Sequence, residues 1–306
     1  MPCPFDATGR SVTCFGEISV LFLDRARWPR LLCVAHVEGA GMDLGISGKV
    51  VFFTGGSKGM GRDAAEMLAA EGCKVAIVAR TRADIDLAVE SIRERGGTAV
   101  GITADITDLD DVKRAVEETR DAFGPPLIVI GQTKFNIVGD FDDITNYEQY
   151  VDSFRSYTMS QIYLLHEVLP GMKAAGWGRY VHVGSAAAKE PEGAIHHVIA
   201  NATRPSTTGL LKTVADEYAR YGITINTIAP GWIATQNAYD YLKRNVGLTS
   251  DDEITTWMRE QARVPAGRMG DPREIASTIV YLCSDLAGYV NGNWIEVDGG
   301  HHRSAF

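Results

Sequence analysis

Short apolar runs alternate with amphipathic stretches along most of this chain, from about residue 48 onward. In the amphipathic stretches, the apolar side chains recur at helical spacing. The apolar runs occupy residues 50–53, 74–79, 98–102 and 127–130, and the helical stretches occupy residues 64–69, 84–95 and 109–123. Buried strands that alternate with helices of about 10 to 15 residues are typical of a parallel sheet with helices on both faces. We therefore predict an α/β fold: a Rossmann-type, doubly wound parallel sheet in three α/β/α layers, forming a single domain.

Residues 1–41 do not follow this pattern. Their apolar segment, residues 18–23, has no basic region before it and is too short for a secretory signal. The sequence contains no run of about 18 apolar residues, so we expect no membrane-spanning helix. We predict a poorly ordered extension at residues 1–41 and a folded domain at residues 42–306.

Composition narrows the class of partner. The chain has 306 residues, 45% hydrophobic and 23% charged, as in soluble globular proteins. Its net charge of −9, with no Lys/Arg-rich run, argues against a nucleic-acid partner. The five cysteines show neither a C-x-x-C pair nor a Cys/His metal spacing, so we expect no disulfide framework, no metal site and reduced thiols in the cytoplasm. We expect a small-molecule partner and no membrane association.

A glycine-rich turn at residues 54–61 joins the first predicted strand to the first predicted helix. Glycines also mark ordinary tight turns, but this one lies at the carboxyl end of a strand, where open α/β sheets bind ligands. Its glycines let the backbone approach a pyrophosphate, and the following helix directs unpaired N–H groups at the anion. We predict that the turn binds a dinucleotide through Thr54, Gly55, Ser57, Lys58, Gly59, Met60 and Gly61.

Charges after the second strand indicate which dinucleotide is bound. An adenosine ribose with free hydroxyls favours an acidic residue at this strand end, whereas a 2′-phosphate favours cations. The strand ends at Arg80, followed by Thr81 and Arg82, and Lys58 lies in the glycine turn, whereas Asp84 is further along. We predict NADP(H) in preference to NAD(H). The alternative is that Arg80 and Arg82 are solvated residues at a helix start.

The chain from about Gly48 to Gly300 resembles the short-chain dehydrogenases/reductases. The motifs that carry the resemblance are spread along the chain. They are the Thr-Gly-x-x-x-Gly-x-Gly turn at 54–61, Ala104-Asp105-Ile106, Leu169-Pro170-x-Met172, Gly176-x-Gly178-Arg179, Gly222-Ile223-Thr224-Ile225-Asn226, Ala229-Pro230-Gly231, Gly267-Arg268 and Val297-Asp298-Gly299-Gly300.

This resemblance implies a homo-oligomeric oxidoreductase, a dimer or a tetramer, whose C-terminal segment supports the subunit interface. It places Asp105 near the adenine and a substrate loop at about residues 232–266. Further cofactor contacts are implied at Ile106, Gly131, Pro230, Gly231, Ile233 and Thr235. Aromatic residues in the loop, Trp232, Tyr239, Tyr241 and Trp257, suit a hydrophobic or ring-bearing carbonyl compound, although packing is the alternative for them.

Two departures from the family pattern affect the chemistry. The family's Asn-Asn-Ala-Gly after the fourth strand is replaced by Ile-Gly-Gln-Thr at 130–133. The Tyr-x-x-x-Lys pair is also missing. Counting back from Asn226 places Arg204 at the lysine position and Ala200 at the tyrosine position, whereas counting forward from Ser185 places Val198 at the tyrosine position. Neither alignment supplies a phenol.

Four residues are the candidates for a rebuilt catalytic site. Ser185 offers a hydroxyl to a substrate carbonyl, or caps local backbone. Arg204 offers a permanent positive charge, or marks a helix irregularity before Pro205. His197 lies seven residues before Arg204 at helical spacing and is a candidate proton donor. Tyr157, at the family's asparagine position, is another.

Each candidate proton donor has an alternative. His196 competes with His197, and both histidines are alternatively loop residues without a catalytic task. Tyr157 is alternatively a packed core tyrosine. We expect His182, inside a strand, to be structural.

The resulting hypothesis is a ketoreductase-like enzyme that transfers hydride between NADP(H) and a carbonyl or hydroxyl group, with a non-standard proton donor. A positioned general acid contributes about 10²- to 10⁴-fold, so a replaced tyrosine does not by itself abolish turnover. Two alternatives stay open: a cofactor-binding regulatory or scaffold protein without turnover, and a lyase or isomerase on the same scaffold.

Overall fold

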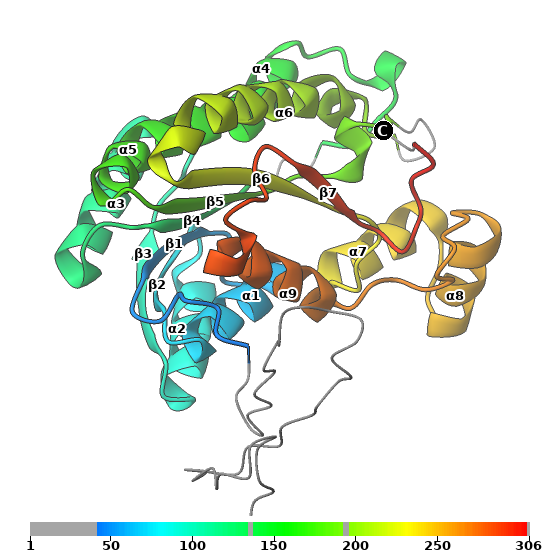
Figure 1. The fold of residues 1–306 in the computed structure, drawn as a ribbon. Helices are drawn as coiled ribbons and strands as arrows, with labels where there is room; N and C mark the ends of the chain where they lie inside the picture. The colour runs from blue at the N-terminus through cyan, green and yellow to red at the C-terminus, as the bar shows by residue number, and fades with distance from the viewer. Residues whose placement is uncertain (1–41, 134–136, 192–195, 305–306) are drawn as a thin grey trace, which may run out of the picture. The chain divides into compact units, whose positions relative to one another are not determined.

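Seven parallel strands form one sheet in the computed structural model of the protein, which describes residues 42–133, 137–191 and 196–304. The strand order is β3-β2-β1-β4-β5-β6-β7, and each neighbouring pair runs parallel (Figure 1). The strands are β1 (Val50–Thr54), β2 (Lys74–Ala79), β3 (Thr98–Thr103), β4 (Ile128–Gln132), β5 (Gly178–Val183), β6 (Ile223–Pro230) and β7 (Trp294–Val297). The predicted doubly wound sheet is confirmed. The predicted extension at residues 1–41 lies outside the described residues.

Helices cover both faces of the sheet (Figure 1). One face carries α1 (Gly59–Ala70), α2 (Arg82–Glu94) and α9 (Pro272–Cys283), and the other carries α3 (Leu109–Phe123), α5 (Ser160–Ala175) and α6 (Val198–Tyr218). Three shorter helices are α4 (Glu148–Phe154), α7 (Gln236–Tyr241) and α8 (Asp251–Glu260). Of the helices in the described ranges, none is both long and apolar enough to cross a membrane.

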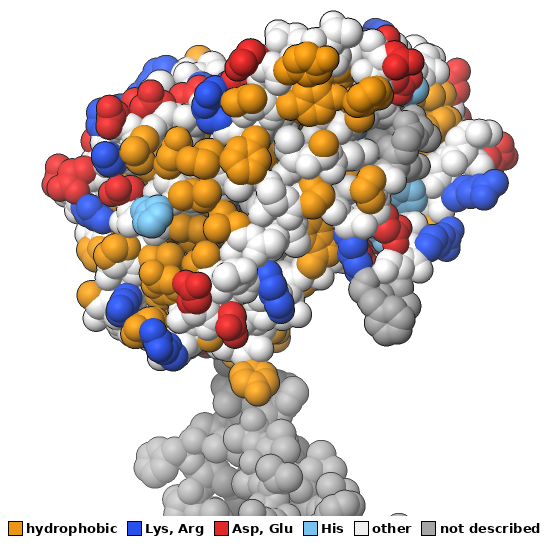
Figure 2. Space-filling model, turned by 90° about the horizontal axis from the view of Figure 1, so that it is seen from above, with side chains coloured by type: hydrophobic (Ala, Val, Ile, Leu, Met, Phe, Trp, Pro, Cys, Tyr) orange, Lys and Arg blue, Asp and Glu red, His pale blue; other side chains and the backbone are white. Residues whose placement is uncertain are grey.

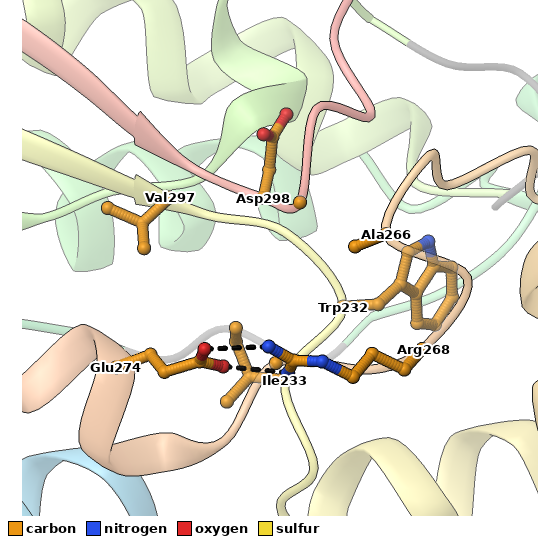
Figure 3. Close-up of a pocket in the computed structure, with 9 residues that line it drawn as sticks. Trp232, Ile233, Ala266, Arg268, Glu274, Val297 and Asp298 are labelled. Atoms are coloured by element: carbon orange, nitrogen blue, oxygen red, sulfur yellow. Dashed lines mark hydrogen bonds and ion pairs between the residues drawn. The ribbon is translucent and has the colours of Figure 1, made fainter.

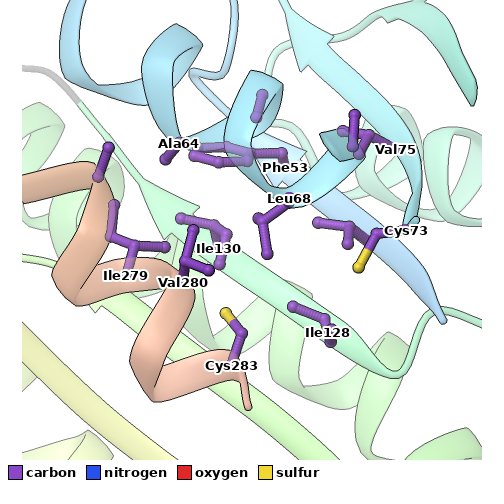
Figure 4. Close-up of a cluster of buried hydrophobic side chains, with 14 of the residues drawn as sticks. Phe53, Ala64, Leu68, Cys73, Val75, Ile128, Ile130, Ile279, Val280 and Cys283 are labelled. Atoms are coloured by element: carbon purple, nitrogen blue, oxygen red, sulfur yellow. The ribbon is translucent and has the colours of Figure 1, made fainter. Parts of the chain in front are cut away.

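Side chains of β1 alternate between the two faces and join two separate cores. Val51 and Phe53 pack with α1, α2 and α9, and Figure 4 shows Phe53 in this cluster with Leu68 and Ile279. Phe52 packs instead with α3, α5 and α6. All three β1 side chains are fully buried. Since burying a large apolar side chain contributes about 1.5–3 kcal/mol, both faces of the continuous apolar run stabilise the sheet.

The helix starts differ in a way that affects ligand binding. Helix α3 is capped by Asp108, whose carboxylate accepts the N–H groups of Asp110 and Asp111, and Asp271 with Glu274 forms a capping box on α9. Helix α1 starts after Lys58, which makes no side-chain cap, and its first turn contains no acidic residue. Its N–H groups are therefore available to an anion.

The face that carries α5 and α6 has an apolar surface (Figure 2). A shallow cavity of about 190 Å³ lies between these helices. Its lining includes Ile162, Leu165, Leu169, Leu210 and Val214.

Gly131 in β4 lies where no larger residue fits. A Cβ at this position would collide with Gln161 Oε1 and lie 2.8 Å from Tyr180 Oη. These two groups are buried and joined by a hydrogen bond of 2.7 Å, which Tyr180 donates. Gly131 is thus held by core packing, whereas the sequence assigned it a cofactor contact.

We expect Gly131→Ala to lower the free energy of unfolding by about 1–3 kcal/mol, because the added methyl group overpacks a buried, hydrogen-bonded contact. Gly209→Ala in α6 is the control, since a Cβ there meets no atom within 4 Å. It should stabilise by about 0.5–1 kcal/mol. Urea denaturation of both variants measures the difference, and equal effects would contradict the packing argument.

Candidate active site

The turn between β1 and α1 forms a backbone cradle. Gly55 and Gly59 have left-handed φ angles of +74° and +51°, which favour glycine. A Cβ on Gly61 would collide with the carbonyl oxygen of Gly55. Thr235, which caps α7, lies beside the cradle, because its methyl group is 3.3 Å from the Cβ position of Gly59. Two predicted cofactor segments, far apart in sequence, therefore meet at this edge of the sheet.

Polar groups at the end of β4 support a ligand at the cradle. Gln132 packs against Gly55, 3.4 Å from its Cβ position. Gln132 Oε1 and Thr133 Oγ1 are buried and have no hydrogen-bond partner among the described residues. Buried polar atoms are normally paired, so these two oxygens fit a ligand with hydrogen-bond donors, as a dinucleotide has. The Thr54 hydroxyl, by contrast, already has a hydrogen-bond partner within the protein. It accepts the Gln132 N–H at 2.8 Å and so joins β1 to β4.

The predicted cations at the end of β2 differ in how they are paired. Lys58 forms an ion pair of 2.8 Å with Asp84, so the acidic residue that lies further along the sequence is adjacent in space. Arg82 pairs with Asp86 at 2.6 Å. Within the described part of the chain, the exposed Arg80 has no ion-pair partner. Arg80 is therefore the cation most available to a phosphate.

The other predicted cofactor residues are placed by local structure. Ser57 is buried in the glycine turn, and Thr81 precedes α2. The Asp105 carboxylate accepts the N–H and hydroxyl of Thr107, at 3.0 and 2.8 Å, and Ile106 packs at the edge of the core. Met60, in the first turn of α1, also packs at the edge of a core.

Segments after β6 are fixed against β7. The Gly231 N–H donates to the Val297 carbonyl at 3.1 Å, and a Cβ on Gly231 would lie 2.7 Å from that of Asp298. Pro230 and Gly231 line one cavity. Ile233 is buried in the core and lines another, smaller cavity.

Two cavities meet at the carboxyl ends of β5 and β6. A cavity of about 170 Å³ is lined by Ser185, His197, Arg204 and Trp232, among others. A larger one, of about 560 Å³, shares the last three of these residues and adds Tyr157. The four catalytic candidates from different parts of the sequence are thus brought together around one site.

Arg204 and Tyr157 form a pair across two helices. The Arg204 guanidinium donates to Tyr157 Oη at 3.1 Å and lies 4.9 Å from the centre of the ring. Tyr157 is 5% exposed and belongs to the π-helical turn Arg155–Met159, a feature that often occurs at functional sites. Helix α6 continues through Pro205, which lies inside it.

His197 lies at the site for a different reason from the predicted one. Helix α6 starts at Val198, so His197 is its N-cap and not a member of a helical face. Burial, followed by the positive charges of Arg204 and His196, lowers the pKa of His197 to about 4. Its Nδ1 is buried without a partner in the described structure. His197 is therefore a neutral imidazole at pH 7.

The two neighbouring histidines have other contacts. His196 forms a contact of 2.6 Å with Asp140, away from the cavity lining. His182 is buried in β5 and its Nδ1 lies 3.0 Å from the Gly131 carbonyl oxygen. Burial lowers the pKa of His182 to about 4, which fits the structural role predicted for it.

Sequence reasoning missed two residues at the site, Glu190 and His302, and named Asp298 only as part of the motif at residues 297–300. Glu190 and His302 line the smaller cavity, and Asp298 contacts His302. The other sequence signal is the pair of adjacent histidines at 301–302, which have no recognisable motif spacing. Their place next to Ser185 depends on how the chain folds back after β7.

The substrate loop is a helical segment with its own small core. Trp232 packs against Trp257 and Tyr241, with ring centres 5.3 and 5.9 Å apart, around the buried Leu242 and Met258. Of its aromatic residues, Trp232 and Tyr241 also line the larger cavity. Packing thus accounts for most of the loop's aromatic residues.

A separate small cavity of about 100 Å³ lies beside this loop (Figure 3). Its wall contains the Arg268–Glu274 ion pair, with N–O distances of 2.8 and 2.7 Å. Among the residues that the structure describes, no cluster of three or more metal-ligating side chains occurs.

We expect acid to destabilise the protein partly through His197. Its folded pKa of about 4 lies below the ordinary value of 6.5, so the unfolded chain binds a proton that the folded chain excludes. This contribution to stability is complete above about pH 6.5 and is lost as the pH falls towards 4. In His197→Gln, the loss of unfolding free energy between pH 7 and pH 5 should shrink by about 1 kcal/mol. His166→Gln, at an exposed position on α5, should behave as wild type, and an unchanged loss in His197→Gln would contradict the assignment.

The site can be compared with known proteins. A family model described as enoyl-(acyl carrier protein) reductase matches residues 55–302. The 3-oxoacyl-acyl-carrier-protein reductase FabG of Vibrio cholerae is 31% identical over 261 residues, which cover 84% of this chain and 98% of the relative. The short-chain reductase protein NovJ of Streptomyces niveus is 31% identical over 257 residues, 82% of this chain and 93% of the relative.

Solved structures of other proteins are also similar to this chain. The L-sorbose reductase from Gluconobacter frateurii, complexed with NADPH and L-sorbose, has a TM-score of 0.79 and 30% identity, covering 86% of this chain and all of that one. An NADPH-bound short chain oxidoreductase from Pseudomonas aeruginosa PAO1, described as containing an atypical catalytic center, has a TM-score of 0.78 and 27% identity. That match covers 85% of this chain and 99% of the other.

Proposed function

Since the chain belongs to the short-chain dehydrogenase/reductase family, we propose that it is an NADP(H)-dependent ketoreductase of a small, hydrophobic or ring-bearing carbonyl compound. The observation that carries the proposal is the meeting of Ser185, Arg204, His197 and Tyr157 around cavities at the carboxyl edge of the sheet. Relatives described as complexed with NADPH support the choice of cofactor.

The cofactor site follows the same edge. The first turn of α1 and Gly55, Gly59 and Gly61 would receive the pyrophosphate, and Arg80 the 2′-phosphate. The unpaired oxygens of Gln132 and Thr133 would bind donors on the ligand. When bound, the nicotinamide supplies or accepts a hydride.

The side chains around the smaller cavity would stabilise charge on the reacting oxygen. Ser185 donates its hydroxyl to the substrate carbonyl. Arg204 places a permanent positive charge on the same cavity and holds the Tyr157 hydroxyl at 3.1 Å. His197 and Tyr157 remain candidates for the non-standard proton donor, although the low pKa of His197 leaves it uncharged at pH 7.

A second candidate function is cofactor binding without turnover, in a regulatory or scaffold protein. What supports it is the proposed alignment, which puts Ala200 or Val198 at the family's tyrosine position and Arg204 at its lysine position, all three on α6. A lyase or isomerase that uses the cofactor structurally is a third reading, distinguished by turnover without net oxidation of NADPH.

The remaining expectations concern the whole protein. We propose a cytoplasmic homo-oligomer, a dimer or a tetramer, and the apolar surface of α5 and α6 supports an assembly (Figure 2). The domain is proposed to span residues 42–306, with the substrate loop at about 232–266.

Arg80→Gln should weaken NADPH binding about 10- to 100-fold and leave NADH binding unchanged, because only NADPH carries the 2′-phosphate. Arg82→Gln is the matched control, since that guanidinium is already paired with Asp86 and should cost little. Fluorescence titration of both cofactors against both variants gives the affinities. Tight NADH binding with negligible NADPH binding by the wild type would overturn the cofactor assignment.

Turnover is tested with NADPH and a panel that includes acetoacetyl thioesters, L-sorbose and aryl ketones. We expect Ser185→Ala and Arg204→Gln to lower kcat about 10²-fold or more, since each removes stabilisation of the developing oxyanion, while NADPH binding persists in Ser185→Ala. His166→Gln on α5 is the control and should retain the wild-type rate. Binding of NADPH by the wild type without turnover on any compound would favour the regulatory reading.

A further inference from the structure

The chain folds back after β7 and fixes a histidine beside the smaller cavity. The carboxylate of Asp298 accepts the His302 N–H at 2.8 Å and the Gly300 N–H at 2.9 Å. His302 Nδ1 lies 2.6 Å from the same carboxylate, and both side chains are less than a tenth exposed. Burial opposes the charge on Asp298, but the hydrogen bonds from His302 and Gly300 hold the pKa of that carboxyl below its ordinary value.

This contact decides which nitrogen of His302 is available. With Nδ1–H directed at Asp298, the nitrogen left to meet a ligand is Nε2. An imidazole oriented in this way by a buried carboxylate has a fixed tautomer and ring position.

The segment after β7, which we call the tail (residues 298–304), is also held by hydrogen bonds on its other side. Glu190, in the loop after β5, accepts the backbone N–H groups of Arg303 and Ser304 at 3.3 and 2.6 Å. The absence of a side chain at Gly231 leaves room for Asp298. His302 is therefore held between two anchors and does not depend on its own packing alone.

The position of His302 connects the site to a polar cavity. His302 lines the cavity of about 170 Å³ together with Ser185 and Arg204. It also lines a neighbouring cavity of about 480 Å³, whose other residues include Gln261, Arg263 and Arg303. Water in this polar cavity can return a proton to the imidazole.

The two cavity histidines have different neighbours. His197 faces Arg204 and has no carboxylate contact in the described structure, whereas His302 contacts Asp298. The other charged and titratable groups at the two cavities that His302 lines are Glu190, His301, Arg303, Arg263, Arg204 and His197. Both histidines share a cavity with Arg204, and of the two only His302 has a carboxylate in contact in the described structure.

We infer that His302, oriented by Asp298, is the group that delivers the proton to the substrate oxygen during reduction; this rests on the proposed ketoreductase function. The carbonyl carbon gains a hydride, which leaves the cofactor oxidised and the substrate reduced. The electron pair of the C=O π bond moves to oxygen and takes the proton from Nε2 of the charged imidazole. Neutral His302 then takes a proton from water, so atoms and charge balance.

His302→Gln in the full chain should lower the rate of reduction about 10²- to 10⁴-fold, while NADPH affinity stays at the wild-type value. The pH dependence of the wild-type rate should change in the variant, because the group that delivers the proton has been removed. Asp298→Asn should also lower the rate, because it removes the carboxylate charge, and its amide N–H can donate to Nδ1 and favour the other tautomer. His166→Gln is the histidine control, and a wild-type rate and pH profile in His302→Gln would overturn the inference.

A second measurement does not require turnover. In protein labelled with ¹⁵N-histidine, the imidazole signals lost in His302→Gln identify His302. They should show the Nδ1–H tautomer at alkaline pH and shift when NADP⁺ is added, whereas the His166 signals should not shift. A His302 signal that shows the other tautomer, or that is unmoved by saturating NADP⁺, overturns the inference.

The two proposals fail in distinguishable ways. If the wild type does not bind NADPH, the proposed function is wrong. If it binds and reduces a substrate while His302→Gln does so equally well, or if His197→Gln and not His302→Gln abolishes the pH dependence, only the role of His302 is wrong. If it binds NADPH without turnover, the ¹⁵N tautomer and the shift with NADP⁺ decide whether His302 is placed as inferred.

Discussion

The parallel register of β1, β4, β5 and β6 is the constraint on which the site depends. Phe53 pairs with Ile130, Gln132 with Val183, and Val183 with Ile228, so these strands end at nearly the same level. The segments after the four strands are therefore brought to one edge of the sheet: the glycine turn, Thr133, Ser185 and Gly231. A slip of one residue in any pair would turn buried side chains to the opposite core and displace the loop at the end of that strand.

Long-range contacts at this edge decide which charged side chains are paired and which are available to a ligand. Lys58 is neutralised by Asp84, whereas Arg80 stays available to a phosphate. Arg204 is drawn to Tyr157 across two helices, and its charge helps keep His197 neutral. The cavities thus bring together Arg204, the Ser185 hydroxyl, the neutral His197 and His302, which Asp298 holds. In the proposed function this arrangement would stabilise an oxyanion by charge and leave proton delivery to a separate group.

On the alignments proposed from the sequence, the family's tyrosine falls on Ala200 or Val198 and its lysine falls on Arg204. Ala200 is buried in the structure. A guanidinium does not release its proton near neutral pH, so on these alignments Arg204 would act through its charge. Under the proposed function the proton would then come from another group, and the segment after β7 brings His302 to the same cavity.

Local sequence patterns determined the sheet, its helices and the glycine turn. Helix α3 spans Leu109–Phe123 as predicted, because Asp108 caps its start and Gly124 follows its end. These signals lie within a few residues of the structure they specify. Contacts such as Lys58 with Asp84, Arg204 with Tyr157, and the tail with Glu190 join residues 26 to 114 positions apart, and only the packed fold decides them. For the same reason, the sequence did not predict that His302 would lie at the site. The chain folds back after β7, and this brings Asp298 and His302 to the end of β5.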